Sequence, residues 1–98
     1  MQILHPACHE KKILPQYFKD VKEGRKNFEL RKDDCDYQIG DLIQLQEWNY
    51  GTYTGETITK EIAYILRDCP EYGLAPGFCI IGLKATNGDL KRKVDEVK

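Results

Sequence analysis

A short segment in the first third of the chain, Gly24 to Arg31, carries the side chains best suited to chemistry. Within it, Lys26, Glu29 and Arg31 follow one another at spacings of three and two residues. An ammonium group holds a phosphate or carboxylate as a point charge, and a guanidinium offers a planar fork of donors to the same groups. A carboxylate between two such cations either orients them or acts as a general acid or base. The segment therefore predicts a site for a small anionic group, with Lys26 and Glu29 as candidates for any catalytic role.

The same segment has the alternation of a β-strand. Phe28 and Leu30 alternate with Glu29 and Arg31, and side chains in a strand point to opposite faces with a period of two. We therefore predict a strand over residues 27–32, with Phe28 and Leu30 facing the core and the polar residues on the opposite face. The alternative is that Glu29 and Arg31 form only a solvated surface pair, which contributes little to stability.

Three further side chains are candidates for the same site. His9 and Lys12 belong to a strand predicted over residues 8–13. If this strand lies beside the motif strand, both reach the same cleft; otherwise His9 is a hydrogen-bonded structural group. Trp48 offers a π-face on which a base can stack, and its alternative role is core packing.

The elements that must position these residues can be read from local signals. A helix begins at Pro15, because proline fits a first helical turn, and it ends before Gly24, where glycine can take a left-handed conformation. The other predicted strands cover residues 42–48, 57–66 and 78–83. One helix and about five strands without βαβ alternation predict an α+β, mainly β domain, most simply a small antiparallel barrel.

The periodicity of apolar residues in the helix and in one strand predicts two apolar faces. The helix should turn three residues toward the core, namely Tyr17, Phe18 and Val21. The strand over residues 57–66 should carry on one face Ile58, Ile62, Tyr64 and Leu66.

The pattern Gly-x-Lys-x-x-Glu-x-Arg, formed by Gly24, Lys26, Glu29 and Arg31, resembles the signature of the ASCH domain, a member of the PUA-like superfamily. The flanking segments resemble a subgroup of short, stand-alone ASCH-like proteins from bacteria and phages. They are the opening strand His9–Pro15, the pair Gly40–Asp41 and the step Glu47–Trp48. The resemblance covers roughly residues 9 to 84 and departs from the expected pattern at Lys11, where an apolar residue is typical.

This resemblance implies a PUA-like barrel whose helix packs beside a cleft that binds RNA, a nucleotide or a modified base. Lys26 and Arg31 would hold phosphate or base oxygens, Glu29 would accept from an amino group, and Trp48 would stack. Some ASCH proteins are amidohydrolases that join the motif lysine to a threonine and to a glutamate on a distant helix. This chain has Glu29 where that threonine falls and shows no second helix. The alternative function is thus a small hydrolase acting on a modified nucleoside or RNA, and a further alternative is a protein-interaction or regulatory role.

The composition indicates the size of the domain, and the distribution of charge indicates the type of ligand. The 98 residues, 41% hydrophobic and 32% charged, form one ordinary domain, which we place at residues 1–84, followed by a charged, mobile tail at 85–98. Net charge is −1, but residues 10–32 hold eight Lys or Arg against four acids, whereas residues 33–61 hold one Lys against seven acids. A local positive region of this kind suits a small anionic group better than a long nucleic-acid track.

We expect a cytoplasmic protein without membrane contact, because no apolar run approaches spanning length and the N-terminus lacks a signal pattern. The chain has four cysteines, Cys8, Cys35, Cys69 and Cys79. None belongs to a Cys-x-x-Cys pair, so free thiols are expected. His5, Cys8 and His9 are close in sequence, but their spacing matches no zinc pattern, so we expect neither a metal nor a cofactor.

If the cysteines are free thiols, a reductant should leave the melting temperature unchanged, because no cross-link restrains the unfolded chain. Thermal melts with and without reductant check this expectation. A fall of several degrees on reduction would show that a disulfide stabilises the fold.

Overall fold

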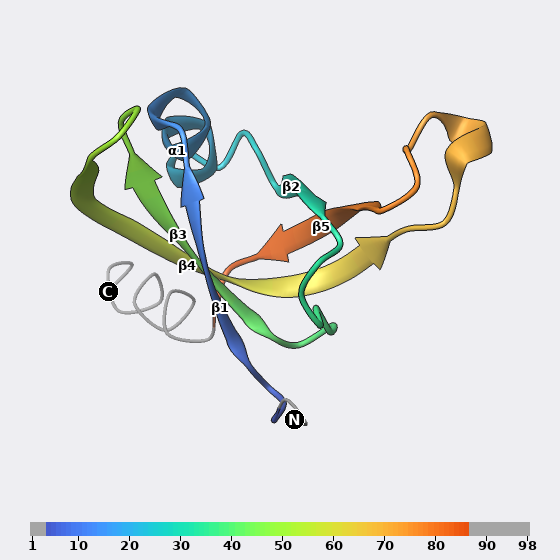
Figure 1. Ribbon diagram of the computed structural model, residues 1–98. Helices are drawn as coiled ribbons and strands as arrows, with labels where there is room; N and C mark the ends of the chain where they lie inside the picture. The colour runs from blue at the N-terminus through green and yellow to red at the C-terminus, as the bar shows by residue number, and fades with distance from the viewer. Residues whose placement is uncertain (1–3, 87–98) are drawn as a thin grey trace.

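The computed structural model describes residues 4–86, which form one α-helix, five strands and one 3₁₀ turn (Figure 1). The elements in chain order are β1 (Cys8–Ile13), α1 (Pro15–Lys22), β2 (Phe28–Lys32), β3 (Leu42–Trp48), β4 (Tyr53–Leu66), η1 (Pro70–Tyr72) and β5 (Phe78–Lys84). The predicted α+β, mainly β class is confirmed. Residues 87–98 of the predicted tail lie outside the described residues. Within residues 4–86, no helix has the length and apolar character needed to cross a membrane.

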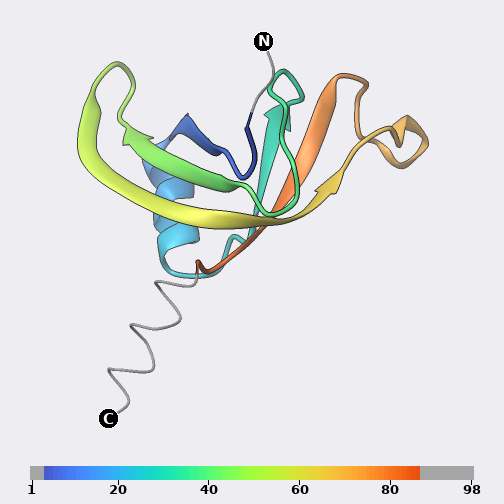
Figure 2. The same cartoon turned by 90° about the horizontal axis from the view of Figure 1, so that it is seen from below.

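All five strands belong to one curved sheet in the order β1-β3-β4-β5-β2. The β1–β3 pair is parallel and the other three pairs are antiparallel. The long strand β4 pairs with β3 along its first part and with β5 along its last part, and Figure 2 shows it curving across the whole sheet. Helix α1 lies against β3 on the concave side (Figure 1).

The structure is an open sheet where the sequence predicted a closed antiparallel barrel. Among the described residues, β1 and β2 are edge strands that share no backbone ladder. The chain leaves β1 at Ile13 and enters α1 two residues later, so the helix follows this edge too soon for β1 to run on alongside β2. One side-chain hydrogen bond spans the opening instead, in which Arg31 Nη2 donates to the carbonyl oxygen of Lys12 at 2.8 Å.

The helix bounds confirm the local signals at Pro15 and Gly24. Pro15 is in the first turn, and Gly24 has the left-handed φ of 83° that glycine adopts without strain. Phe18 and Val21 are buried in the core, as predicted. Tyr17 was predicted to join them, but it is half-exposed, because it sits at the side of the helix that faces β2 across an open space. The core consists of Ile13, Phe18, Val21, Tyr37, Ile43, Leu45, Ile62, Cys79, Ile81 and Leu83.

A β-bulge in β4 corrects the predicted apolar face of that strand. The register with β5 shifts between Ile62 and Tyr64, so one extra residue falls there. Ile62 is buried before the bulge, and Ile65 packs against the core after it. Tyr64 and Leu66 were predicted to share the face of Ile62, but the bulge turns both to the outside.

Strand β2 is also turned the opposite way from the prediction. Glu29 is only 4% exposed, whereas Phe28 is 49% and Leu30 58% exposed. The cause is the pairing with β5, in which Glu29 lies opposite Ile81, a fully buried core residue. Because paired residues share a face of the sheet, Glu29 points inward and its apolar neighbours point outward.

A buried carboxylate fixes the N-terminal end of β1. Asp41 is 1% exposed, and its Oδ1 accepts from His5 Nδ1 and Ala7 N, each at 2.9 Å. Its Oδ2 accepts from His9 Nε2 at 2.8 Å and from Gln38 N at 3.1 Å. Burial alone raises the pKa of Asp41, but these four hydrogen bonds outweigh it and lower the pKa to about 2. Asp41 therefore holds residues 5–9 against the turn that precedes β3.

The variant Asp41→Asn should be destabilised by about 2 kcal/mol or more at pH 7, because an amide cannot accept all four hydrogen bonds. Since folding lowers the pKa of Asp41 below its ordinary value of 3.8 to about 2, the ionised carboxylate stabilises the fold above pH 4 and loses this effect as pH falls toward 2. Urea denaturation at pH 7, 5 and 3 measures both effects, with exposed Asp34→Asn as control. An equal deficit of Asp41→Asn at every pH would contradict the assignment.

Candidate functional site

Lys26 is positioned by the backbone that leaves the helix. After Gly24 the chain folds back, and the backbone N–H groups of Arg25 and Lys26 both donate to the carbonyl oxygen of Asp20, at 2.9 and 3.0 Å. These bonds satisfy a carbonyl group near the helix end and fix the direction in which the chain enters β2. Lys26 is thereby held two residues before Phe28, where β2 begins.

Glu29 and Arg31 are positioned by the register of β2 with β5. Glu29 pairs with Ile81 and Arg31 with Cys79, both fully buried. The two polar side chains therefore project from the inner face of the sheet toward α1 and β1. This is the same inversion that exposes Phe28 and Leu30.

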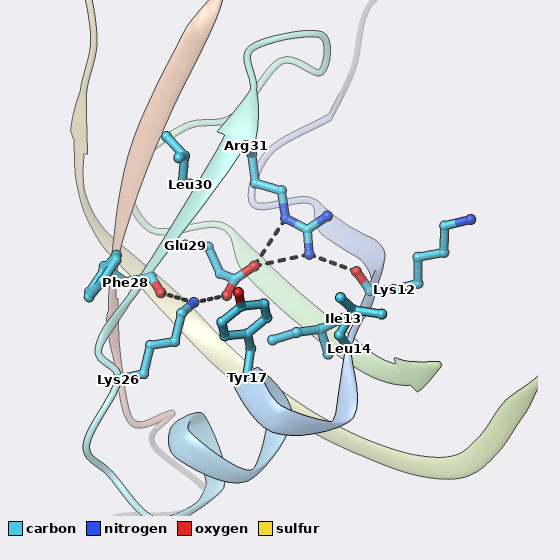
Figure 3. A pocket seen from close by; sticks show the side chains of 9 residues that line it. All are labelled: Lys12, Ile13, Leu14, Tyr17, Lys26, Phe28, Glu29, Leu30 and Arg31. Carbon is cyan, nitrogen blue, oxygen red and sulfur yellow. Dashed lines mark hydrogen bonds and ion pairs between the residues drawn. The ribbon is translucent and has the colours of Figure 1, made fainter. Parts of the chain in front are cut away.

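The three charged groups form one network (Figure 3). Lys26 Nζ makes an ion pair with Glu29 Oε1 and donates to the carbonyl oxygen of Phe28 at 2.6 Å. Glu29 Oε2 accepts from Arg31 Nε at 3.1 Å and lies 3.0 Å from Arg31 Nη2. Arg31 Nη2 also donates to Lys12 O, so the network runs from the loop after α1 across β2 to β1.

Burial makes this network more than a surface ion pair. The side chain of Glu29 is 6% exposed. A carboxylate so far from water is costly to hold ionised unless cations and donors surround it, as Lys26 and Arg31 do here. The formal charge of the three groups is positive, because two cations face one anion. Within residues 4–86, Arg31 Nη1 makes no hydrogen bond, so its N–H groups remain available to a ligand.

A pocket of about 340 Å³ lies over this network, in the opening between the two edge strands. Its lining comes from the end of β1, from α1, and from β2 with the loop before it (Figure 3). The lining residues are Lys12, Ile13, Leu14, Tyr17, Lys26, Phe28, Glu29, Leu30 and Arg31. The pocket thus combines apolar and aromatic walls with a charged floor, which is the usual composition of a small-molecule site.

The structure brings Lys12, Lys26, Glu29 and Arg31 to this pocket, but Lys12 contributes differently from the prediction. Its carbonyl oxygen faces Arg31, while its side chain points away from Glu29 (Figure 3). The ammonium group lies 4.4 Å from the ring centre of Trp48, a cation–π contact. Trp48 does not line the pocket and so is not placed to stack on a ligand there.

His9 does not join the pocket either. It shares a face of β1 with Ile13 but lies four residues earlier along the strand, where its ring bonds to Asp41 and lies 4.8 Å from the ring of Tyr37. His5, which is close to His9 in sequence, also binds Asp41. Among residues 4–86, no group of three or more His, Cys, Asp or Glu side chains is arranged to hold a metal ion. The cysteines, all within that range, are free thiols.

Tyr17 is the pocket residue that sequence reasoning missed. Its ring centre lies 5.8 Å from Lys26 Nζ, and the ring of Phe28 lies 4.9 Å from the same atom on another side. The helical period grouped Tyr17 with the core residues Phe18 and Val21. Its hydroxyl group was the available signal, since a tyrosine often keeps one end in contact with water or a polar ligand.

Over residues 4–86, fold and site together define a small, mostly β protein with one α-helix and a charged pocket at the opening of its sheet. Residues 8–83 match the family described as "Domain of unknown function (DUF3850)", and the chain belongs to this family. It is also similar to the "Uncharacterized 12.9 kDa protein in GpA 3'region" of Escherichia phage P2, with 43% identity over 54 residues. That alignment covers 55% of this chain and 50% of the phage protein, so the chain matches about half the length of this relative.

The variant Glu29→Ala should lose about 3 kcal/mol of stability, because it leaves two partly buried cations without their carboxylate. A double-mutant cycle with Arg31→Ala should give a coupling energy of about 1–3 kcal/mol. Chemical denaturation measures each variant. Exposed Lys32 on the same strand provides the control cycle, and its coupling with Glu29 should be near zero. A Glu29–Arg31 coupling as small as that of the control would mean that the pair is only solvated surface.

Proposed function

We propose that the pocket binds one nucleotide or modified nucleoside, either free or as an unpaired nucleotide of an RNA. The observation that carries this proposal is the buried Glu29 held between Lys26 and Arg31 on the floor of a pocket with apolar and aromatic walls. Such a pocket offers donors for phosphate or base oxygens and rings for a base in the same place.

Each side chain has a distinct part in this proposal. Arg31 holds an oxygen of the ligand through its free Nη1, and Lys26 adds a positive point charge on the other side of Glu29. Glu29 fixes the direction of both cations, and its remaining lone pairs can accept from an amino group of a base. Tyr17 offers the face for stacking, a part that the sequence had suggested for Trp48, and Phe28 borders the pocket at its edge.

The size and charge of the pocket favour a single nucleotide over a long strand. A volume of about 340 Å³ is at the lower end of the range for small-molecule sites. The network has a small positive charge, and the whole chain has a net charge of −1. A protein that follows a nucleic-acid backbone needs many cations along a track, whereas here they converge on one point.

The resemblance to ASCH domains supports the same proposal. The residues of that pattern, Lys26, Glu29 and Arg31, are the ones that meet on the pocket floor. A PUA-like fold, with this open sheet as a variant of the barrel, is part of what we propose. The pocket's position beside α1 agrees with the cleft that the resemblance implies.

A hydrolase acting on a modified nucleoside or RNA is the second candidate, favoured by the direct contact between the ammonium of Lys26 and the carboxylate of Glu29 in a pocket. Such a pair could move a proton during a reaction. However, the ammonium group of Lys26 donates to Glu29 and to Phe28 O, and its third N–H group can donate to an oxygen of a ligand. This arrangement suits binding. We therefore favour a binding function over hydrolysis for this pocket.

If the proposal is right, Lys26→Ala should weaken binding of nucleoside monophosphates and short single-stranded RNA about 10-fold or more at low salt, and this loss should shrink as salt rises. Glu29→Gln should have a smaller effect or tighten binding, because it removes a negative charge. Titration by calorimetry or fluorescence measures both, and Lys32→Ala is the matched control from the same strand.

Product detection in the same experiment separates binder from hydrolase. A hydrolase would lose turnover in both variants while binding survived, since general acid–base groups act mainly in the transition state. Absence of both binding and turnover across a panel of nucleotides, modified nucleosides and RNAs would reject this function for the pocket and favour a role in protein interaction.

A further inference from the structure

The outer face of the sheet around β5 is apolar across three strands. In the register of the sheet, Phe28 and Tyr64 flank Gly82 on either side, and Leu30 and Leu66 flank Ile80. Paired residues share a face, so these side chains form two adjacent rows, and Phe78 continues them along β5. We call this surface the outer apolar face; its side chains are Phe28, Leu30, Tyr64, Leu66, Phe78 and Ile80.

These side chains are exposed together, which is different from scattered surface hydrophobics. Five of the six are between 36% and 60% exposed, with Tyr64 the most exposed. Single exposed apolar residues are common, but a contiguous apolar surface of a few hundred Å² is often an interaction site. Gly82 has no side chain between Phe28 and Tyr64, and Tyr64 packs directly over it.

We propose that the outer apolar face packs against the same face of a second copy of this chain, in a two-fold symmetric dimer. Face-to-face packing of two sheets is a standard way to bury such surfaces. With about 200 Å² for a whole aromatic side chain and somewhat less for leucine, the exposed parts of the five side chains amount to about 450 Å². Two copies would bury about 900 Å² from these side chains, and Ile80, the backbone and the rim would bring the total to about the lower limit of 1,000 Å² for specific interfaces.

Charged residues lie at the two ends of this face. At one end Lys32 lies opposite Phe78 in the register. At the other end Lys84 Nζ is 3.2 Å from Glu61 Oε2. A two-fold axis across the strands would bring Lys32 of one copy near the Lys84–Glu61 ion pair of the other, where Glu61 can accept from both lysines. The net charge of −1 on each chain gives little long-range repulsion between copies.

The outer apolar face can be tested without changing the pocket. Phe28 and Leu30 lie next to both surfaces, but Tyr64 and Leu66 are on β4 and do not line the pocket. Substitutions at these two positions therefore report on association alone. Ile39, which is 64% exposed in the turn before β3, offers a matched control outside this face.

Sedimentation velocity or light scattering on the full chain should show a mass that rises with concentration from 11.4 kDa toward twice that value. The double variant Tyr64→Lys/Leu66→Lys should raise the dissociation constant about 100-fold, because two charges would be desolvated at the centre of the interface. Ile39→Lys should leave the constant unchanged. Circular dichroism and thermal melts establish that each variant is folded.

A dilution series of the wild-type chain by NMR tests the same surface without substitution. Backbone amide shifts in β2, β5 and residues 61–66 should change with concentration, while those of β1 should stay constant. A mass of 11.4 kDa at every concentration up to the millimolar range would overturn the dimer and leave a different protein as the occupant of this face. A dimer that persists in the double variant, or shift changes confined to other elements, would overturn it equally.

Discussion

A single buried carboxylate organises the open side of this protein. Glu29 lies on the inner face of β2, where water is too scarce to stabilise its charge, so Lys26 and Arg31 must stay within contact. Arg31 then reaches the carbonyl oxygen of Lys12 on the opposite edge strand. The sheet is thus held across its opening by a guanidinium group where a barrel would have a backbone ladder, and the pocket occupies the space that closure would have filled.

The local elements of the fold could be predicted because their signals are local. A proline in the first helical turn and a glycine with left-handed φ mark the bounds of α1 in any tertiary context. The faces of the strands could not be predicted in the same way. Strand β5 has apolar residues on both of its faces, with Ile80 on one and Ile81 on the other, so either face of β2 could have matched it. The choice depends on Lys26 and Arg31 neutralising Glu29, which the period of the strand does not reveal.

The candidate site was predictable where its members are close in sequence. The spacing of Lys26, Glu29 and Arg31 already places them within reach of one another, and the structure confirms that they meet. His9 and Trp48 were assigned to the site from farther along the chain, and each has a stronger partner elsewhere. Asp41 binds the ring of His9, and the side chain of Lys12 covers Trp48. A polar or aromatic side chain contacts the nearest group in space that can bond to it. When that group lies tens of residues away in the sequence, the sequence spacing does not identify it.

Strand β2 has a charged inner face and an apolar outer face, and each of these features would reduce the stability of a protein that binds no ligand or partner. An ionised side chain on the inner face costs desolvation, and replacing such groups by apolar residues often stabilises a fold. Apolar side chains on the outer face remain partly in water after folding, so they gain less from folding than core residues do and favour association. Exchanging the polarity of the two faces of β2, with Phe28 and Leu30 inside and Glu29 outside, would remove both costs. The inversion is therefore best understood through what each face contacts: the charged inner face provides the floor of a pocket that needs preorganised donors, and the apolar outer face is completed only when a second surface covers it.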